Sequence, residues 1–134
     1  MLKRIPFLFA FNTLLAITTG VLIYHLLILT EIIPFTAVWG GRLRTRDEMF
    51  RFESISLLIN SCFILILYIK IRRLRNGQSS TWINGILWLF VAVFALNTLG
   101  NLVSFSSLET IVFTPLTTLL ALFTARVALE KQRD

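Results

Sequence analysis

The sequence has little of what metal centres and most enzyme sites need. Its 134 residues include one cysteine, Cys62, and one histidine, His25. A single cysteine cannot form an intramolecular disulfide, and neither residue has the partners that a zinc motif requires. A G-x-S-x-G nucleophile motif and a P-loop are also missing. We therefore predict no metal site and no cofactor. Nothing in the sequence favours an enzyme, although a carboxylate pair such as Glu31 and Glu53 is compatible with acid–base chemistry.

Charge is scarce as well. Only 15% of the residues are charged and 56% are hydrophobic, whereas soluble domains have about 25% charged and about 45–50% apolar residues. This composition predicts a membrane protein. The chain has 13 Lys and Arg against 7 Asp and Glu, and the basic residues lie at the ends of apolar runs. That placement favours contact with lipid headgroups and argues against nucleic-acid binding.

The apolar residues form four long runs separated by short polar segments, at about residues 5–29, 46–71, 82–102 and 108–129. About 20 apolar residues in a helix cross the hydrocarbon core of a bilayer. The first run continues well past the usual length of a signal-peptide core and no A-x-A cleavage site follows it, so we interpret it as a retained helix. The sequence predicts an all-α fold, a four-helix transmembrane bundle in one domain of residues 1–134.

Two helix starts carry a capping signature. Thr45 is followed three residues later by Glu48, which is the capping-box pattern, and Ser106 and Glu109 have the same spacing. Pro115 falls inside the fourth run, where it removes one backbone hydrogen bond and predicts a kink.

The distribution of Lys and Arg predicts the orientation. With four spans, the N-terminus, the middle connection and the C-terminus lie on one side. That side has nine basic residues: Lys3, Arg4, Lys70, Arg72, Arg73, Arg75, Arg126, Lys131 and Arg133. The other side has four: Arg42, Arg44, Arg46 and Arg51. The positive-inside rule therefore places both termini in the cytoplasm, with the basic face against anionic headgroups.

In this orientation the polar side chains of the runs gather toward the outer leaflet. The candidate positions are His25, Glu31, Glu53, Asn60, Asn97 and Asn101. Polar groups at membrane depth are costly unless they face one another or a water-filled cavity, so this layer predicts a site. Each member also has a simpler interpretation. Asn97 and Asn101 are compatible with hydrogen bonds that hold helices together, His25 with an interfacial position, and Glu31 with the water boundary.

The first connection predicts a loop that folds over this polar layer. Gly40 and Gly41 allow a sharp turn, and Trp39 has the amphipathic character of a membrane-interface anchor. We expect the Trp-Gly-Gly-Arg segment to be partly ordered over the outer mouth of the bundle, with Arg42 paired to Glu53 or Glu31. The alternative is that these charges are solvated and that Trp39 is an ordinary interfacial residue.

Four segments carry a resemblance: VWGGRL at residues 38–43, EMFRFESISLLIN at 48–60, ALNTLGN at 95–101 and FTPLTTLLAL at 113–122. Together they resemble a group of short four-span bacterial membrane proteins. The resemblance implies a bacterial plasma membrane and carries no activity with it. The small multidrug resistance transporters are similar only in size and number of spans, because the first run here has no glutamate between residues 5 and 29.

Two classes of function fit these observations. The first is ligand binding or transport through the polar site, and its candidate residues are Glu53, Asn60, Asn97, Asn101, Arg42, Trp39, His25 and Glu31. The second is a structural or accessory subunit that associates with copies of itself or with another membrane protein. The two classes differ in one respect: a binding site contains a cavity, whereas residues that only hold helices together are fully paired.

Overall fold

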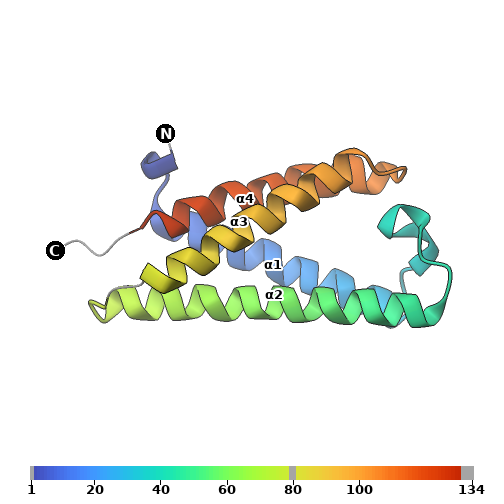
Figure 1. The fold of residues 1–134 in the computed structure, drawn as a ribbon, viewed down its shortest axis with the longest axis horizontal. Helices are drawn as coiled ribbons and strands as arrows, with labels where there is room; N and C mark the ends of the chain where they lie inside the picture. Colours follow the sequence, from blue (N-terminus) through green and yellow to red (C-terminus); the bar gives the residue numbers. More distant parts are fainter. Residues whose placement is uncertain (1, 79–80, 131–134) are drawn as a thin grey trace.

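The computed structural model describes residues 2–78 and 81–130, and these residues form helices, turns and loops with no strand. Four long helices run back and forth along one axis (Figure 1). Their bounds are Phe7–Leu29 (α1), Arg46–Arg75 (α2), Thr81–Leu102 (α3) and Thr114–Ala128 (α4). A π-helical segment, Glu109–Phe113 (η4), leads directly into α4. Each is long and apolar enough to span a membrane, with η4 and α4 counted as one helix, which confirms the prediction of four apolar helices of spanning length.

Local chemistry explains why α2 begins and ends where it does. The Thr45 hydroxyl accepts a hydrogen bond from the Glu48 backbone N–H at 3.2 Å, and the Glu48 carboxylate accepts one from the Thr45 N–H at 3.3 Å. The predicted capping box is therefore confirmed. At the other end, basic residues in the last turn offset the helix dipole, and Gly77 adopts φ 66° just beyond the helix.

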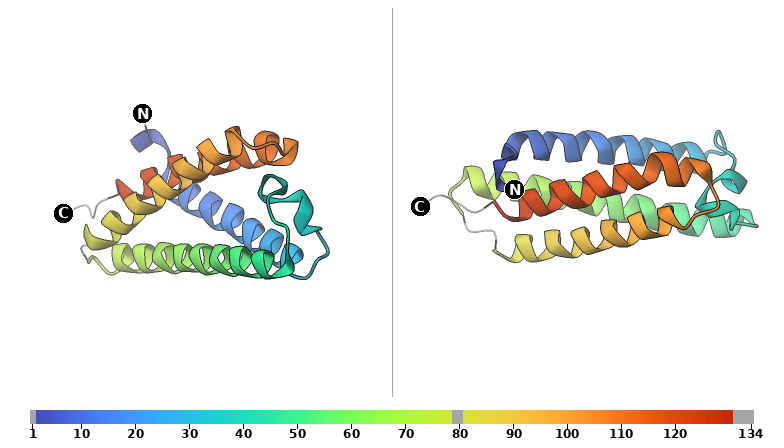
Figure 2. Two further views of the ribbon diagram at one scale, coloured as in Figure 1. Left: turned by 45° about the vertical axis from the view of Figure 1, so that its right-hand side comes forward. Right: turned by 90° about the horizontal axis from the view of Figure 1, so that it is seen from above.

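The helices form a wedge. α3 and α4 pack against each other along their length, and α4 also packs on α1 (Figure 2). By contrast, α2 and α3 lie together where the chain passes between them and diverge toward the opposite end (Figure 1). We call the narrow end, where both termini lie, the terminal end, and the wide end the loop end. Lys131 and Arg133, which the orientation count includes, lie outside the described residues.

Apolar side chains fill the two ends differently. The main core joins all four helices and includes Leu14, Phe63, Leu87 and Leu120. A separate, smaller cluster at the loop end consists of Ile28, Val38, Leu43 and Met49. Two of its four members belong to the connection between α1 and α2, so that connection is anchored by burial of its own apolar side chains.

That connection contains two short 3₁₀ turns, Phe35–Ala37 (η2) and Trp39–Gly41 (η3). We call residues 35–42 the lid. It bends back from the tip of the α1–α2 hairpin toward α3 and α4, and so occupies the wide end of the wedge (Figure 2). Trp39, Gly40 and Gly41 have φ angles of 55°, 65° and 70°. Glycine adopts such left-handed angles at little cost, whereas a tryptophan is strained there.

The start of the fourth span agrees with the sequence prediction in position but not in its cap. Residues 107 and 108 are already helical ahead of the π-helical segment, and the Ser106 carbonyl accepts the first hydrogen bond of the run from the Thr110 N–H at 3.0 Å. Glu109 does not reach back to close a capping box because its carboxylate is bound elsewhere. Pro115 lies inside this continuous span, directly after the π-helical segment, and a local π adjustment is one way in which a membrane helix accommodates the missing proline N–H.

Candidate functional site

Glu53 is the central residue of the loop end. Its carboxylate is completely buried although α2 has just entered its apolar stretch. One oxygen, Oε2, lies 2.6 Å from His25 Nδ1 on α1, and the other, Oε1, accepts a hydrogen bond from Trp39 Nε1 in the lid at 2.7 Å. Buried carboxylates need such partners, because an unpaired one is very costly. This triad therefore ties two helices and the lid together.

A second carboxylate holds the lid from the opposite side. Glu109 Oε1 accepts a hydrogen bond from the Gly40 backbone N–H at 2.8 Å, and its Oε2 accepts one from the Ser104 hydroxyl. A Cβ at Gly40 would lie only 3.3 Å from Ser104 Oγ. The lid backbone thus approaches the α3–η4 connection more closely than most side chains at position 40 would allow.

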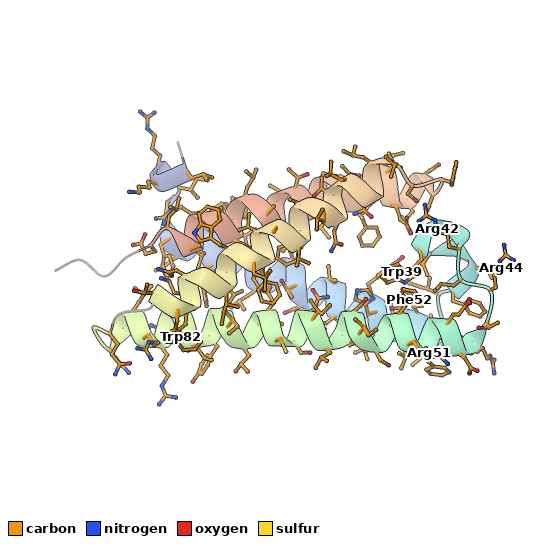
Figure 3. All side chains as sticks on the ribbon, in the orientation of Figure 1. Trp39, Arg42, Arg44, Arg51, Phe52 and Trp82 are labelled. Carbon is orange, nitrogen blue, oxygen red and sulfur yellow. The ribbon has the colours of Figure 1, made fainter. Side chains whose placement is uncertain are left out.

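Beneath the lid lies a cavity of about 420 Å³. All four helices and the lid contribute to its wall, which is mostly apolar and contains the aromatic residues Tyr24, Trp39, Phe52, Phe94 and Phe113. Cavities that bind small molecules have volumes of about 300–1,000 Å³, apolar walls and a few well-placed polar groups. Figure 3 shows Trp39 and Phe52 side by side where the lid meets α2, while Arg44 points away from the bundle.

The cavity opens sideways between α2 and α3. Several of its lining residues on these two helices are exposed, among them Phe52, Ile55 and Ile59 on α2 and Leu96 and Asn97 on α3. Leu96 is 67% exposed. These positions belong to the spans, so the opening faces the region that lipid occupies around a membrane protein.

The structure brings most of the expected site residues together. His25, Trp39, Arg42, Asn60, Asn97 and Asn101 all line the cavity, and Glu53 lies behind His25 and Trp39. Glu31 does not belong to this group. It pairs with Arg46 at 2.7 Å on the outside of the loop.

The expected pairing of Arg42 was wrong. Glu53 is bound by His25 and Trp39, and Glu31 by Arg46, so neither carboxylate is paired with Arg42. Instead the Arg42 side chain lies beside Gly40, on the same side as Glu109, without forming an ion pair within the described residues. Sequence spacing could not reveal this, because the left-handed turn at residues 39–41 decides where the side chain projects.

The asparagines differ in what they contact. The Asn101 side-chain amide lies 3.4 Å from Thr117 Oγ1 on α4, which also accepts a hydrogen bond from Thr98 at 2.9 Å. This network joins α3 to α4, as expected for residues that hold helices together. Asn60 donates to the Ser56 carbonyl in its own helix. Asn97 has no hydrogen-bond partner among residues 2–78 and 81–130, so its amide remains available to the cavity.

Sequence reasoning missed Glu109 and Ser104. The S-x-x-E pattern at residues 106–109 predicts a helix cap, and this interpretation assigned Glu109 to the cap. An acidic residue at the start of the fourth span also places a carboxylate at the loop end, and this was the signal for Glu109 as a site residue. Sequence reasoning also missed the buried cluster at the terminal end. Lys70, counted there as a basic flanking residue, is completely buried and donates to Asn84 Oδ1 at 2.7 Å and to the Glu130 carbonyl at 2.6 Å.

Arg126 completes that terminal cluster. It is 6% exposed, donates through Nε to the Ile5 carbonyl at 2.6 Å, and forms an ion pair with Glu130 at 2.7 Å. Both cations are thus used to tie backbone carbonyls and helices together. Neither residue lines the cavity at the loop end.

The cavity at the loop end has the volume and the lining of a site that binds a small molecule. Among the described residues, no group of three His, Cys, Asp or Glu side chains is arranged to hold a metal ion. The cavity offers amide, guanidinium and aromatic contacts to a ligand. No protein-family model matches the chain, and no curated protein or solved structure matches it significantly.

Proposed function

We propose that this protein binds a hydrophobic or amphipathic small molecule in the cavity beneath the lid. The observation that carries the proposal is a 420 Å³ cavity with an apolar wall and a polar roof at one end of a four-span bundle. If the polar residues only held helices together, they would all be hydrogen-bonded to one another and would not line a cavity. Here Asn97 and Arg42 line the cavity and form no hydrogen bond or ion pair within the described chain, and both are exposed, as expected where the cavity is open.

The sideways opening indicates how the ligand reaches the site. A molecule dissolved in the bilayer can pass between α2 and α3 without crossing the apolar terminal half of the bundle, where the main core is closed. The lid covers the cavity from the loop end, so water-soluble molecules have a longer path. Transport requires in addition that the lid or the wedge moves, and we include transport only as an extension of binding.

The second candidate is a structural or accessory subunit. It is favoured by the hydrogen bonds among Thr98, Asn101 and Thr117, which join two helices and need no ligand. On this hypothesis the open side between α2 and α3 receives a helix of a partner or of a second copy.

One pair of variants separates the two candidates. Gly100 lines the cavity and Gly85 lies on the same helix outside it, and an added Cβ meets nothing within 4 Å at either position. Gly100→Phe should fill the cavity, whereas Gly85→Phe should leave it open. Native mass spectrometry of gently purified protein should show a bound small molecule in wild type and Gly85→Phe and none in Gly100→Phe. A retained second polypeptide in place of a small molecule would support the accessory subunit.

We also propose that the protein resides in a bacterial plasma membrane with both termini in the cytoplasm. The nine-to-four distribution of Lys and Arg supports this orientation. Exposed basic residues of the terminal end, such as Lys3, Arg4 and Arg75, then face anionic headgroups. Alkaline phosphatase fused at Gly41 should be active, and the same enzyme fused at Gln78 should be inactive. The opposite pattern would reverse the orientation.

A further inference from the structure

The polar groups at the roof of the cavity include more carboxylates than guanidinium groups. Two carboxylates, Glu53 and Glu109, and one guanidinium, Arg42, line the cavity or bond directly to its lining. Arg42 is exposed, whereas Glu53 is completely buried. Carboxylates at membrane depth are unfavourable unless polar partners or a cation offset their charge.

The wall of the cavity suits a cation that is large and apolar. Trp39 and Phe52 have ring centroids 5.1 Å apart, and Tyr24 and Phe113 have centroids 4.9 Å apart. Phe94 contributes a fifth ring. Aromatic faces attract cations through the negative charge of their π-systems, and tryptophan does so most strongly. The same rings supply apolar contact for hydrocarbon or aryl groups around the charge.

Glu53 increases the attraction of the Trp39 face. The indole donates its only N–H to this buried carboxylate at 2.7 Å, and a hydrogen bond to an anion polarises the donor ring toward greater electron density. The buried Glu53 therefore acts through Trp39 without reaching the ligand itself.

We infer that the cavity takes a hydrophobic cation, such as a quaternary ammonium or phosphonium ion, whose charge lies against the Trp39 face near Glu109. This inference rests on the proposed function and specifies its ligand class. Arg42 lies beside Gly40 at the edge of the lid and is exposed, so solvent screens its charge more strongly than the charges of groups buried under the lid.

Two ions of the same shape and opposite charge test the inference. Equilibrium dialysis of the protein in an uncharged detergent measures binding of tetraphenylphosphonium and tetraphenylborate, and the Gly100→Phe variant measures the partitioning of each ion into the micelle. After this subtraction, tetraphenylphosphonium should bind at least about tenfold more tightly than tetraphenylborate.

Variants of two carboxylates then test whether the bound cation lies near Glu109. Glu109→Gln should weaken phosphonium binding about tenfold and leave borate binding unchanged or stronger. Glu31→Gln removes the same charge at the same end of the bundle but outside the cavity, and should have no effect. If Glu109→Gln does not fold, Trp39→Leu should produce the same loss of phosphonium binding.

Other outcomes overturn the inference. Equal binding of the two ions, or tighter binding of the borate, would remove the preference for a cation while leaving the cavity as a binding site. Absence of binding by either ion would also overturn it. The proposed function itself fails only if, in addition, native mass spectrometry finds no small molecule that Gly100→Phe displaces.

Discussion

Two buried cations lie at the terminal end, whereas one buried and one partly buried carboxylate lie at the loop end, and the two pairs bind different parts of the chain. Lys70 and Arg126 donate to the backbone carbonyls of Glu130 and Ile5, and so fix the chain just after α4 and just before α1. Glu53 and Glu109 instead accept from Trp39 and Gly40, which belong to a loop. At the terminal end the buried cations therefore hold packed helices together, whereas at the loop end the carboxylates hold the lid over a cavity.

The difference follows from the direction in which the helices diverge. At the terminal end all four helices share one core, so a charged group buried there has neighbours on every side. Toward the loop end α2 leaves α3, and the space between them is only partly filled by the lid. The two carboxylates hold the lid from opposite sides. Loss of either one should therefore loosen the lid without separating the helices at the terminal end.

Loss of Glu53 should have the largest effect. Glu53→Ala leaves the His25 ring and the Trp39 N–H without their buried partner. A buried donor that loses its acceptor costs about 1–3 kcal/mol, so with two such donors the free energy of unfolding should fall by about 2–6 kcal/mol. Denaturant titration in mild detergent, followed by helix content, measures it. Glu31→Gln affects an exposed pair and should cost no more than about 1 kcal/mol. An unchanged unfolding curve for Glu53→Ala would refute the role of the triad.

Loss of Lys70 at the terminal end should have the next largest effect on the free energy of unfolding. Lys70→Met keeps the shape of the side chain but leaves Asn84 Oδ1 and the Glu130 carbonyl without this donor. A buried acceptor that loses its donor costs about 1–3 kcal/mol. Unlike Glu53→Ala, this change should leave ligand binding in the remaining folded protein intact. Arg72→Met, two residues away and exposed, is the control, with an expected effect within about 0.5 kcal/mol. If the two variants lost the same free energy of unfolding, the hydrogen bonds of Lys70 to Asn84 and Glu130 would not hold the helices together.

The lid itself can be tested with two glycines. Gly40→Ala and Gly41→Ala both place a side chain at a left-handed φ, which costs about 1–2 kcal/mol. At position 40 the new Cβ also lies 3.3 Å from Ser104 Oγ, whereas at position 41 its nearest neighbour is the Thr36 carbonyl at an ordinary 3.6 Å. Gly40→Ala should therefore be the more destabilising variant and should weaken ligand retention. The reverse order would mean that the lid does not approach the α3–η4 connection closely.

The sequence predicted the four apolar helices and the capping box at Thr45, and six of its eight candidate site residues line the cavity. Helix length, capping pattern and the placement of polar residues within apolar runs are local properties, so they can be recognised without coordinates. The partners of Glu53 were not predictable in the same way. They depend on the left-handed turn at Trp39 and on the divergence of α2 from α3, which no local pattern encodes. Lys70 was misjudged for a similar reason, since a lysine near a helix end looks the same whether it is solvated or buried.

The smallest expected effect has the opposite sign and concerns the packed part of the bundle. Thr18 on α1 is completely buried, and its hydroxyl has no hydrogen-bond partner among the described residues. Thr18→Val keeps the shape and removes the unpaired hydroxyl, so it should raise the free energy of unfolding by about 1 kcal/mol. Thr117→Val makes the same chemical change where the hydroxyl donates to the Phe113 carbonyl at 2.8 Å and accepts from Thr98 at 2.9 Å, and it should lower stability by a similar amount. Thermal unfolding of the two variants measures the contrast. A stabilising effect of Thr117→Val would contradict the assignment of Thr117 to a network that joins α3 and α4. A destabilising effect of Thr18→Val would instead contradict the view that its buried hydroxyl lacks a partner.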